Sequence, residues 1–233
     1  MRRAWVGTLI ICVISCCVMA FSDNLAELRK QAEAGNVDAQ VELGNKYAIG
    51  GEVPRNLPLA AKWFRMAAEQ GNVDAETKLA MMYDGGLGVQ RDPKAAKSWF
   101  EKAAKQGNTA AQMRLALACE NGTYGEKDTA QAIRWYQTAA ESGAVNAQVR
   151  LGYIFRDDLD EVSHDYPTAL KWFQQAAEKG SPDAEFAIGK MYEQGMGVPS
   201  STNQAVEWYQ RASAHGLPQA RVVLQNMGIA PNQ

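Results

Sequence analysis

The sequence predicts an all-α solenoid built from antiparallel helix pairs. Three residue types recur along its 233 residues at a step of 36, with a single step of 37. Tryptophan occurs as Trp63, Trp99, Trp135, Trp172 and Trp208; glycine as Gly35, Gly71, Gly107, Gly143, Gly180 and Gly216; alanine as Ala39, Ala75, Ala111, Ala147, Ala184 and Ala220. Because the tryptophan, glycine and alanine series keep the same spacing across the chain, the repeat alone indicates the fold class, before any local pattern is considered.

The first helix of each repeat is expected to begin just after the repeat's glycine. A residue suited to N-capping stands there in four repeats: Asn36, Asn72, Asn108 and Ser181. Apolar residues then recur at i, i+4 and i+8, as in Ala75, Leu79 and Tyr83, which places them on one helical face. Cys119 takes the aromatic position of its repeat, so we expect it to be a small core residue.

The second helix of each repeat is expected to begin seven residues before the tryptophan. Every residue at that point is a favoured N-cap: Asn56, Asp92, Asp128, Asp165 and Ser201. Small pairs such as Ala103-Ala104 let neighbouring helices approach closely, and we expect each tryptophan to fill the space between repeats. Each second helix should end at the next repeat's glycine, which tolerates the left-handed conformation.

These boundaries divide the whole chain. We expect a signal peptide over residues 1–20, a leading helix within 21–35, and a closing helix with a polar tail over 217–233. Between them lie five repeats, at 36–71, 72–107, 108–143, 144–180 and 181–216. The expected architecture is 12 helices in a right-handed superhelix, without a sheet or a second domain.

The first 20 residues have the pattern of a secretory signal. Arg2 and Arg3 precede an uncharged apolar run, and Val18 and Ala20 fit a small-residue cleavage site. A periplasmic or secreted location follows. Two alternatives stay open: an uncleaved anchor, because the run reaches the short limit for a spanning helix, and lipidation of Cys16, because Val13 to Cys16 resembles a lipoprotein box. Contact with a membrane is expected only in those two cases.

Composition and motifs argue against several classes of function. Lys and Arg total 24 against 26 Asp and Glu, which excludes a broadly basic nucleic-acid binder. With two histidines, and without an H-E-x-x-H, C-x-x-C or Walker motif, we expect no enzyme, no cofactor and no metal site. The acidic segment 157–161 lacks the central glycine and ligand spacing of a calcium loop, so a solvated loop is the favoured interpretation.

One repeat carries a longer motif: Asp74-Ala75-Glu76-x-x-Leu79-Ala80-x-x-Tyr83-x-x-Gly86-x-Gly88-Val89, followed by Ala96-x-x-Trp99-Phe100-x-x-Ala103-Ala104-x-x-Gly107. This motif resembles the Sel-1-like repeat, a relative of the tetratricopeptide repeat, and the resemblance covers residues 36–216. The fourth repeat departs most, because its segment 155–165 is one residue longer and lacks the turn glycines.

The resemblance implies a scaffold that binds a protein or peptide, in envelope assembly, host interaction or regulation. A disulfide-rich branch of the family is linked to penicillin binding and β-lactamase-like activity, and this is the alternative function. That branch carries a cysteine pair in its repeats, whereas cleavage after Ala20 would leave this chain with Cys119 alone. An anchored structural spacer is a third class.

In the resembling tetratricopeptide family the first helices line a concave binding face. Residues two and six positions after each repeat's alanine point away from the helix face that carries the core, and the residue three positions after it borders them. The predicted partner-binding residues are Lys78, Met81, Met113, Arg114, Leu117, Arg150, Tyr153 and Phe186. An apolar strip with basic neighbours suits an apolar and acidic partner segment, or a terminal carboxylate, with Arg114 and Arg150 gripping two carboxylates. The alternative is that these side chains pack between adjacent first helices.

Overall fold

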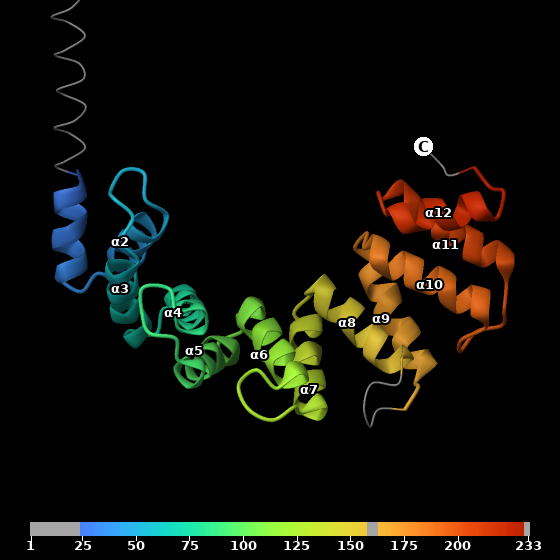
Figure 1. Ribbon diagram of the computed structural model, residues 1–233, viewed down its shortest axis with the longest axis horizontal. Coiled ribbons are helices and arrows are strands. Elements are labelled where there is room, and N and C mark those ends of the chain that lie inside the picture. The colour runs from blue at the N-terminus through green and yellow to red at the C-terminus, as the bar shows by residue number, and fades with distance from the viewer. Residues whose placement is uncertain (1–23, 158–162, 231–233) are drawn as a thin grey trace, which may run out of the picture. The chain divides into compact units, whose positions relative to one another are not determined.

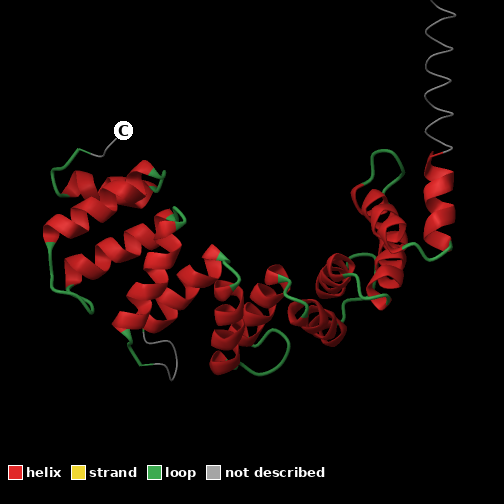
Figure 2. Cartoon of the chain, turned by 180° about the vertical axis from the view of Figure 1, so that it is seen from behind, coloured by secondary structure: helices red, strands yellow, loops and turns green. Residues whose placement is uncertain are grey.

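The computed structural model describes residues 24–157 and 163–230, and within these ranges it contains helices and loops but no strand (Figure 2). This confirms the predicted all-α repeat fold. The predicted signal peptide, Cys16 and most of the acidic segment 157–161 lie outside the described residues. None of the described helices is both long enough and apolar enough to span a bilayer. The contacts divide the chain into two compact units, Met1–Asn108 and Thr109–Gln233.

The N-terminal unit consists of helical residues 24–33 and two helix pairs (Figure 1). The pairs are α2 (Val37–Ile49) with α3 (Leu57–Glu69), and α4 (Val73–Gly85) with α5 (Pro93–Lys105). Helix α3 also packs on α4, which joins the two pairs. One core cluster runs from Leu28 to Met82, so the leading helical segment is part of this core.

The C-terminal unit continues the same arrangement. Its pairs are α6 (Thr109–Asn121) with α7 (Thr129–Glu141), α8 (Val145–Arg156) with α9 (Tyr166–Glu178), and α10 (Pro182–Gln194) with α11 (Thr202–Ala214). Helix α12 (Pro218–Asn226) closes the unit against α11. The second helix of one pair packs on the first helix of the next, and the first helices α8 and α10 also touch.

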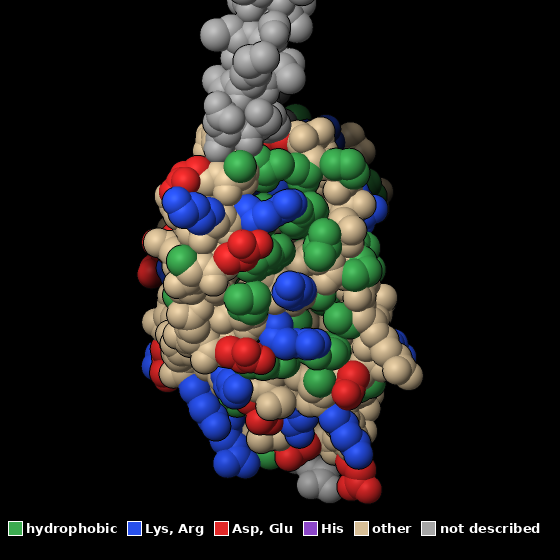
Figure 3. Space-filling view, turned by 90° about the vertical axis from the view of Figure 1, so that its left-hand side faces the viewer, with side chains coloured by type: hydrophobic (Ala, Val, Ile, Leu, Met, Phe, Trp, Pro, Cys, Tyr) green, Lys and Arg blue, Asp and Glu red, His purple; other side chains and the backbone are tan. Residues whose placement is uncertain are grey.

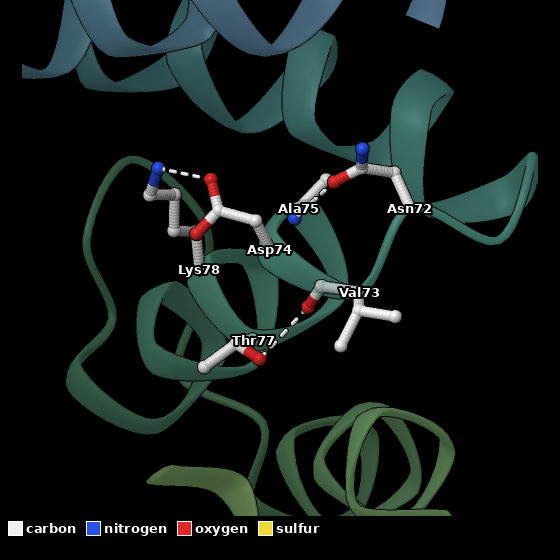
Figure 4. Close-up of polar contacts among 6 residues, drawn as sticks. All are labelled: Asn72, Val73, Asp74, Ala75, Thr77 and Lys78. Atoms are coloured by element: carbon white, nitrogen blue, oxygen red, sulfur yellow. Dashed lines mark hydrogen bonds and ion pairs between the residues drawn. The ribbon is translucent and has the colours of Figure 1, made fainter. Parts of the chain in front are cut away.

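The predicted caps Asn36, Asn72 and Ser181 begin the first helices α2, α4 and α10 as expected. The Asn72 side chain accepts a hydrogen bond from the Ala75 amide at 2.9 Å, at the start of α4 (Figure 4). All five predicted caps of the second helices accept from an amide of the first turn. The glycine after each second helix has a positive φ, between 77° and 92°, which a residue with a Cβ adopts only with strain.

The tryptophans play a smaller part in the core than expected. Trp63 is buried, but Trp135 and Trp172 are half-buried at the rims of their clusters. The residue that follows each tryptophan is the one that is almost fully buried. These aromatic residues are Phe64, Phe100, Tyr136, Phe173 and Tyr209. The half-buried tryptophans do pack against the core clusters of neighbouring helices, but the next side chain points more directly into the core.

In three repeats the buried aromatic ring lies against a glycine of the preceding first helix, which is Gly44, Gly152 or Gly189. The same position holds Ala80 or Ala116 in the other two repeats. A Cβ added to Gly152 would lie 2.5 Å from the Phe173 ring, which is closer than van der Waals contact allows. The aromatic residue and the small residue therefore set how closely the two helices of a pair approach.

Phe173→Ala should destabilise the protein by about 3–5 kcal/mol, because it empties a fully buried aromatic site. Trp172→Ala, one residue earlier, should cost less, because part of that side chain is already in water. Urea unfolding of both variants, followed by circular dichroism, measures the difference. An equal or larger loss for Trp172→Ala would contradict the assignment of Phe173 as the core residue.

Candidate functional site

The eight predicted partner-binding residues are divided between the two units. Lys78 and Met81 lie in α4 of the N-terminal unit. The other six lie in the C-terminal unit, on the first helices α6, α8 and α10: Met113, Arg114, Leu117, Arg150, Tyr153 and Phe186. Side chains of α6 and α8 meet where Arg150 contacts Glu120, and α8 touches α10. The structure thus brings six of the eight residues onto neighbouring helices.

Three of the eight residues are exposed, and Lys78 is engaged locally. Leu117 is 44% exposed and Met81 is 37% exposed, and Arg114 is exposed beside Leu117 on α6. The Lys78 ammonium lies 2.5 Å from the Asp74 carboxylate, one turn earlier on α4 (Figure 4), and 5.5 Å from the centre of the Phe64 ring. Lys78 therefore covers the joint between α3 and α4.

Three others pack against buried residues, and the two aromatic ones contact the second helix of their own repeat rather than an adjacent first helix, as the alternative interpretation had it. Met113 lies against the cluster that contains Tyr136. The Tyr153 ring meets the Phe173 ring edge to face at 5.1 Å, and the Phe186 ring lies 5.2 Å from that of Tyr209. Burial raises the pKa of Tyr153. These side chains contribute mainly to packing, with one edge left at the surface.

Arg150 requires a correction, because its guanidinium is already paired. Its Nε donates to Glu120 Oε2 at 3.1 Å, and a second N–H group contacts Glu120 Oε1. Glu120 is buried and also accepts a hydrogen bond of 2.8 Å from the Tyr136 hydroxyl. Burial, together with nearby Cys119, raises the pKa of Tyr136 to about 12. The expectation that Arg150 is available to grip a partner's carboxylate is wrong, because Glu120 holds it.

A sequence signal for this cluster exists and was missed. The buried aromatic residue is tyrosine in two repeats, Tyr136 and Tyr209, and in both the first helix carries a glutamate nine residues after its alanine. Tyr209 donates to Glu193 at 2.9 Å, and Lys190 donates to the same carboxylate at 2.8 Å. The hydrogen bond from Lys190 holds the pKa of Glu193 below its usual value. The remaining repeats have phenylalanine at the aromatic position and no glutamate opposite it.

A second missed feature is a series of buried polar residues directly after each repeat's alanine: Gln40, Glu76, Gln112, Gln148 and Glu185. Gln40 and Gln148 each donate to a backbone carbonyl at the end of the preceding helix, at 3.0 and 3.1 Å. These hydrogen bonds fasten α2 and α8 to the helix before each of them, because the acceptor carbonyls belong to the last turn of that helix.

The two glutamates of this series bind side chains instead. Gln106 donates to Glu76 at 2.8 Å. Glu185 is fully buried, accepts from His215 Nδ1 at 2.8 Å, and lies 3.4 Å from Arg211 Nε. His215 and Arg211 thus both contact this buried carboxylate. Buried charge of this kind stabilises the fold only while its partners remain.

Two shallow hollows lie in the N-terminal unit. One, of about 600 Å³, is lined by Arg65, Tyr83, Val89, Gln90, Arg91 and Asp92. The other, of about 340 Å³, is lined by residues 42–52 around the exposed Ile49. On the face of the protein that Figure 3 shows, basic and acidic side chains alternate around hydrophobic ones. Among the described residues there is no cluster of three or more His, Cys, Asp or Glu able to hold a metal ion.

Glu76→Gln should stabilise the protein at pH 7. Burial raises the pKa of Glu76 above its ordinary 4.5, so the folded state disfavours the ionised form. The stability that Glu76 contributes is present below pH 4.5 and is lost as the pH rises through the raised value. The melting temperature of the variant should exceed that of the wild type at pH 7 and match it near pH 4. The exposed Glu69→Gln is the control, and a gain that does not change with pH would contradict this account.

Arg150→Glu and Arg114→Glu should differ sharply, although both residues stand at the same repeat position. Reversing Arg150 places a second carboxylate against the buried Glu120, so we expect a loss of at least about 1–3 kcal/mol. Reversing the exposed Arg114 should change stability by no more than about 0.5 kcal/mol. Chemical unfolding of the two variants tests this, and equal losses would show that the pairing of Arg150 is unimportant.

Comparison with known proteins gives a consistent family assignment. The profile of the Sel1 repeat matches residues 37–72, 73–108, 109–143, 145–181 and 182–217. A crystal structure of a Sel1 repeat protein from Oxalobacter formigenes is 32% identical, with a TM-score of 0.72, over 87% of this chain and 58% of that one. A protective antigen of uropathogenic Escherichia coli with an SLR fold is 29% identical, with a TM-score of 0.58, over 89% of this chain and 53% of that one.

A curated relative matches over a shorter stretch. The secretory immunoglobulin A-binding protein EsiB of Escherichia coli O6:H1 is 46% identical over 44 residues, which are 19% of this chain and 9% of that protein. This chain spans just over half of each of these two solved relatives and under a tenth of the curated one. Sel1 repeat proteins are generally protein-interaction scaffolds rather than enzymes. With five matched repeats covering most of its length, the chain belongs to the Sel1 repeat family.

Proposed function

We propose that this chain is an exported scaffold without catalytic activity that binds a segment of a partner protein on helix α6 of its C-terminal unit. The observation that supports this proposal is the pair Arg114 and Leu117. Leu117 is 44% exposed and Arg114 is exposed, and they stand three residues apart on the same face of α6. An exposed apolar side chain beside a cation offers a contact for both an apolar and an acidic group.

The rest of α6 holds this pair rigidly. Ala111, Leu115 and Ala116 are buried on its other faces, and Met113 packs into the adjoining core. Tyr153 stands at the position of Leu117 in the next repeat and keeps an edge at the surface. A partner segment would meet side chains that are already ordered, so less conformational entropy is lost on binding.

The charges on this surface favour one carboxylate from the partner rather than two. Arg150 is neutralised by Glu120, whereas Arg114 forms no ion pair within the described part of the chain. The predicted clamp of two arginines is therefore replaced by a single available guanidinium. A guanidinium can bind one carboxylate through two parallel hydrogen bonds.

Export rests on the leader and on the kind of partner that a relative's name describes. Arg2, Arg3 and the apolar run that follows fit a secretory signal. The name of the curated relative describes binding to secretory immunoglobulin A, which is a partner outside the cell. That match covers 44 residues, so only the class of partner, an extracellular or envelope protein, is proposed for this chain. No observation favours the β-lactamase-like alternative.

Photo-crosslinking should find a partner at α6. With benzoylphenylalanine at Leu117, the exported protein should form a discrete adduct, whereas the same group at the exposed Glu207 of α11 should not. Arg114→Glu combined with Leu117→Asp should weaken binding of the identified partner at least about tenfold, because both a charge-assisted and an apolar contact are lost. The control for the charge reversal is Arg134→Glu, which reverses one exposed arginine on α7 in the same way.

The same preparation tests export. The mature protein, recovered from the periplasm or the medium, should begin at Phe21 when its N-terminus is sequenced. A protein retained in the cytoplasm with Met1 in place would contradict the proposed location. Equal adduct formation at Leu117 and Glu207, or unchanged binding by the double variant, would contradict the proposed surface.

A further inference from the structure

The larger hollow of the N-terminal unit lies far along the sequence from α6 and involves none of its residues. Arg65 reaches it from α3 and Tyr83 from α4, while Val89, Gln90, Arg91 and Asp92 come from the connection to α5. Its volume of about 600 Å³ is typical of a pocket that holds a small ligand or a few residues of a peptide. All of these elements belong to one compact unit.

Contacts within the unit fix the two arginines in place. Arg65 Nη2 donates to the Tyr83 hydroxyl, and its guanidinium carbon lies 5.8 Å from the centre of the Tyr83 ring. Arg91 Nε donates to the backbone carbonyl of Asp84 at 2.9 Å, near the end of α4. Each guanidinium carries five N–H donors, so each retains four beyond the hydrogen bond that positions it. The pocket is thus bordered by pre-positioned donors.

The charge of the lining favours an anion. Asp92 is the acidic member, and its Oδ1 already accepts from the amides of Lys94 and Ala95 as the N-cap of α5. The lining therefore contains two guanidinium groups and a single carboxylate, and that carboxylate is already hydrogen-bonded to the backbone of α5. Planar guanidinium groups match carboxylates in shape and in hydrogen-bonding geometry. Val89 and the Tyr83 ring add apolar surface for a neighbouring side chain of the ligand.

The preceding repeat carries the same arrangement 36 residues earlier. Arg29 Nη2 donates to the Tyr47 hydroxyl at 2.7 Å, and Arg55 Nε donates to the Ala48 carbonyl at 3.1 Å. Later repeats lose the set: the position of Arg65 is occupied by glutamine in the C-terminal unit, as Gln137, Gln174 and Gln210. Packing within a repeat therefore does not require an arginine there. Two equivalent sets, one repeat apart, suit an extended ligand with acidic side chains along its length.

We propose that the pocket of Arg65, Tyr83 and Arg91 binds the side-chain carboxylates of an acidic peptide segment, with Arg29, Tyr47 and Arg55 offering a weaker, equivalent contact one repeat away. The site goes beyond the surface on α6, because it lies in the other unit and uses none of its residues. It gives the N-terminal unit a recognition role of its own.

Binding of a defined peptide to the full chain tests this site. The probe is a fluorescein-labelled peptide, blocked at its C-terminus, with two Glu-Glu pairs separated by Val-Gly; the reference probe has glutamine in place of every glutamate. Fluorescence anisotropy at low salt should show binding of the acidic probe only, weakening as salt is added. Arg65→Gln with Arg91→Gln should weaken it at least about tenfold, because charge-assisted hydrogen bonds are lost.

Matched variants separate this site from general charge attraction. Lys62→Gln with Lys105→Gln removes the same charge from exposed positions of the same unit and should change the affinity less than about twofold. Tyr83→Phe keeps the ring but removes the hydroxyl that holds Arg65, so it should weaken binding less than the double arginine variant, with an unchanged melting temperature. Leu117→Asp on α6 should have no effect, which distinguishes this site from the proposed partner surface. Failure of the acidic probe to bind, or equal losses in the two double variants, would overturn the proposal.

Discussion

The contact between a buried aromatic ring and a small residue of the preceding helix supports the whole fold. Phe64, Phe173 and Tyr209 each lie against a glycine, and a single added Cβ would meet the ring at 2.5–2.6 Å. This contact brings the two helices of a pair close together, and the alanine pairs allow the next repeat to approach as closely. Because a buried aromatic residue and a small residue stand at these two positions in every repeat, surface residues can differ from repeat to repeat without disturbing the core.

A second set of contacts passes from one repeat to the next through buried polar groups. Gln40 and Gln148 donate to carbonyls at the ends of the preceding helices, and these carbonyls also accept from the amides of Gly35 and Gly143. Glu185 instead makes its contacts within one repeat. It binds His215 and Arg211, which lie at the end of the repeat that Glu185 begins. Such groups are costly to bury alone, so they favour one register of neighbouring helices over a shifted one.

Periodicity made most of the fold predictable, because caps, glycines and alanines act locally and repeat at one step. The caps at Asn72, Asp92 and Asp165 follow from their side chains and positions alone. The burial of Phe173 rather than Trp172 did not follow, since adjacent positions differ by only 100° around a helix and either can face the core. The pairing of Arg150 with Glu120 joins residues 30 apart. From the sequence, the role of Glu120 could be found only by comparing the repeats that have tyrosine at the buried aromatic position with those that have phenylalanine there.

The arginines show how one residue type takes different roles on a repeated scaffold. Arg150 is held by a buried carboxylate, so its charge is used within the fold, whereas Arg114 at the equivalent position meets no such group among the residues that the structure describes. Arg65 and Arg91 are each fixed by one hydrogen bond to a neutral oxygen, which orients the guanidinium but leaves its charge uncompensated. An arginine is therefore available for recognition when its anchor is a hydroxyl or a carbonyl. Whether an arginine meets a carboxylate or a neutral oxygen depends on the neighbouring helix and not on the arginine itself. The position of an arginine in the repeat is therefore insufficient to assign its function.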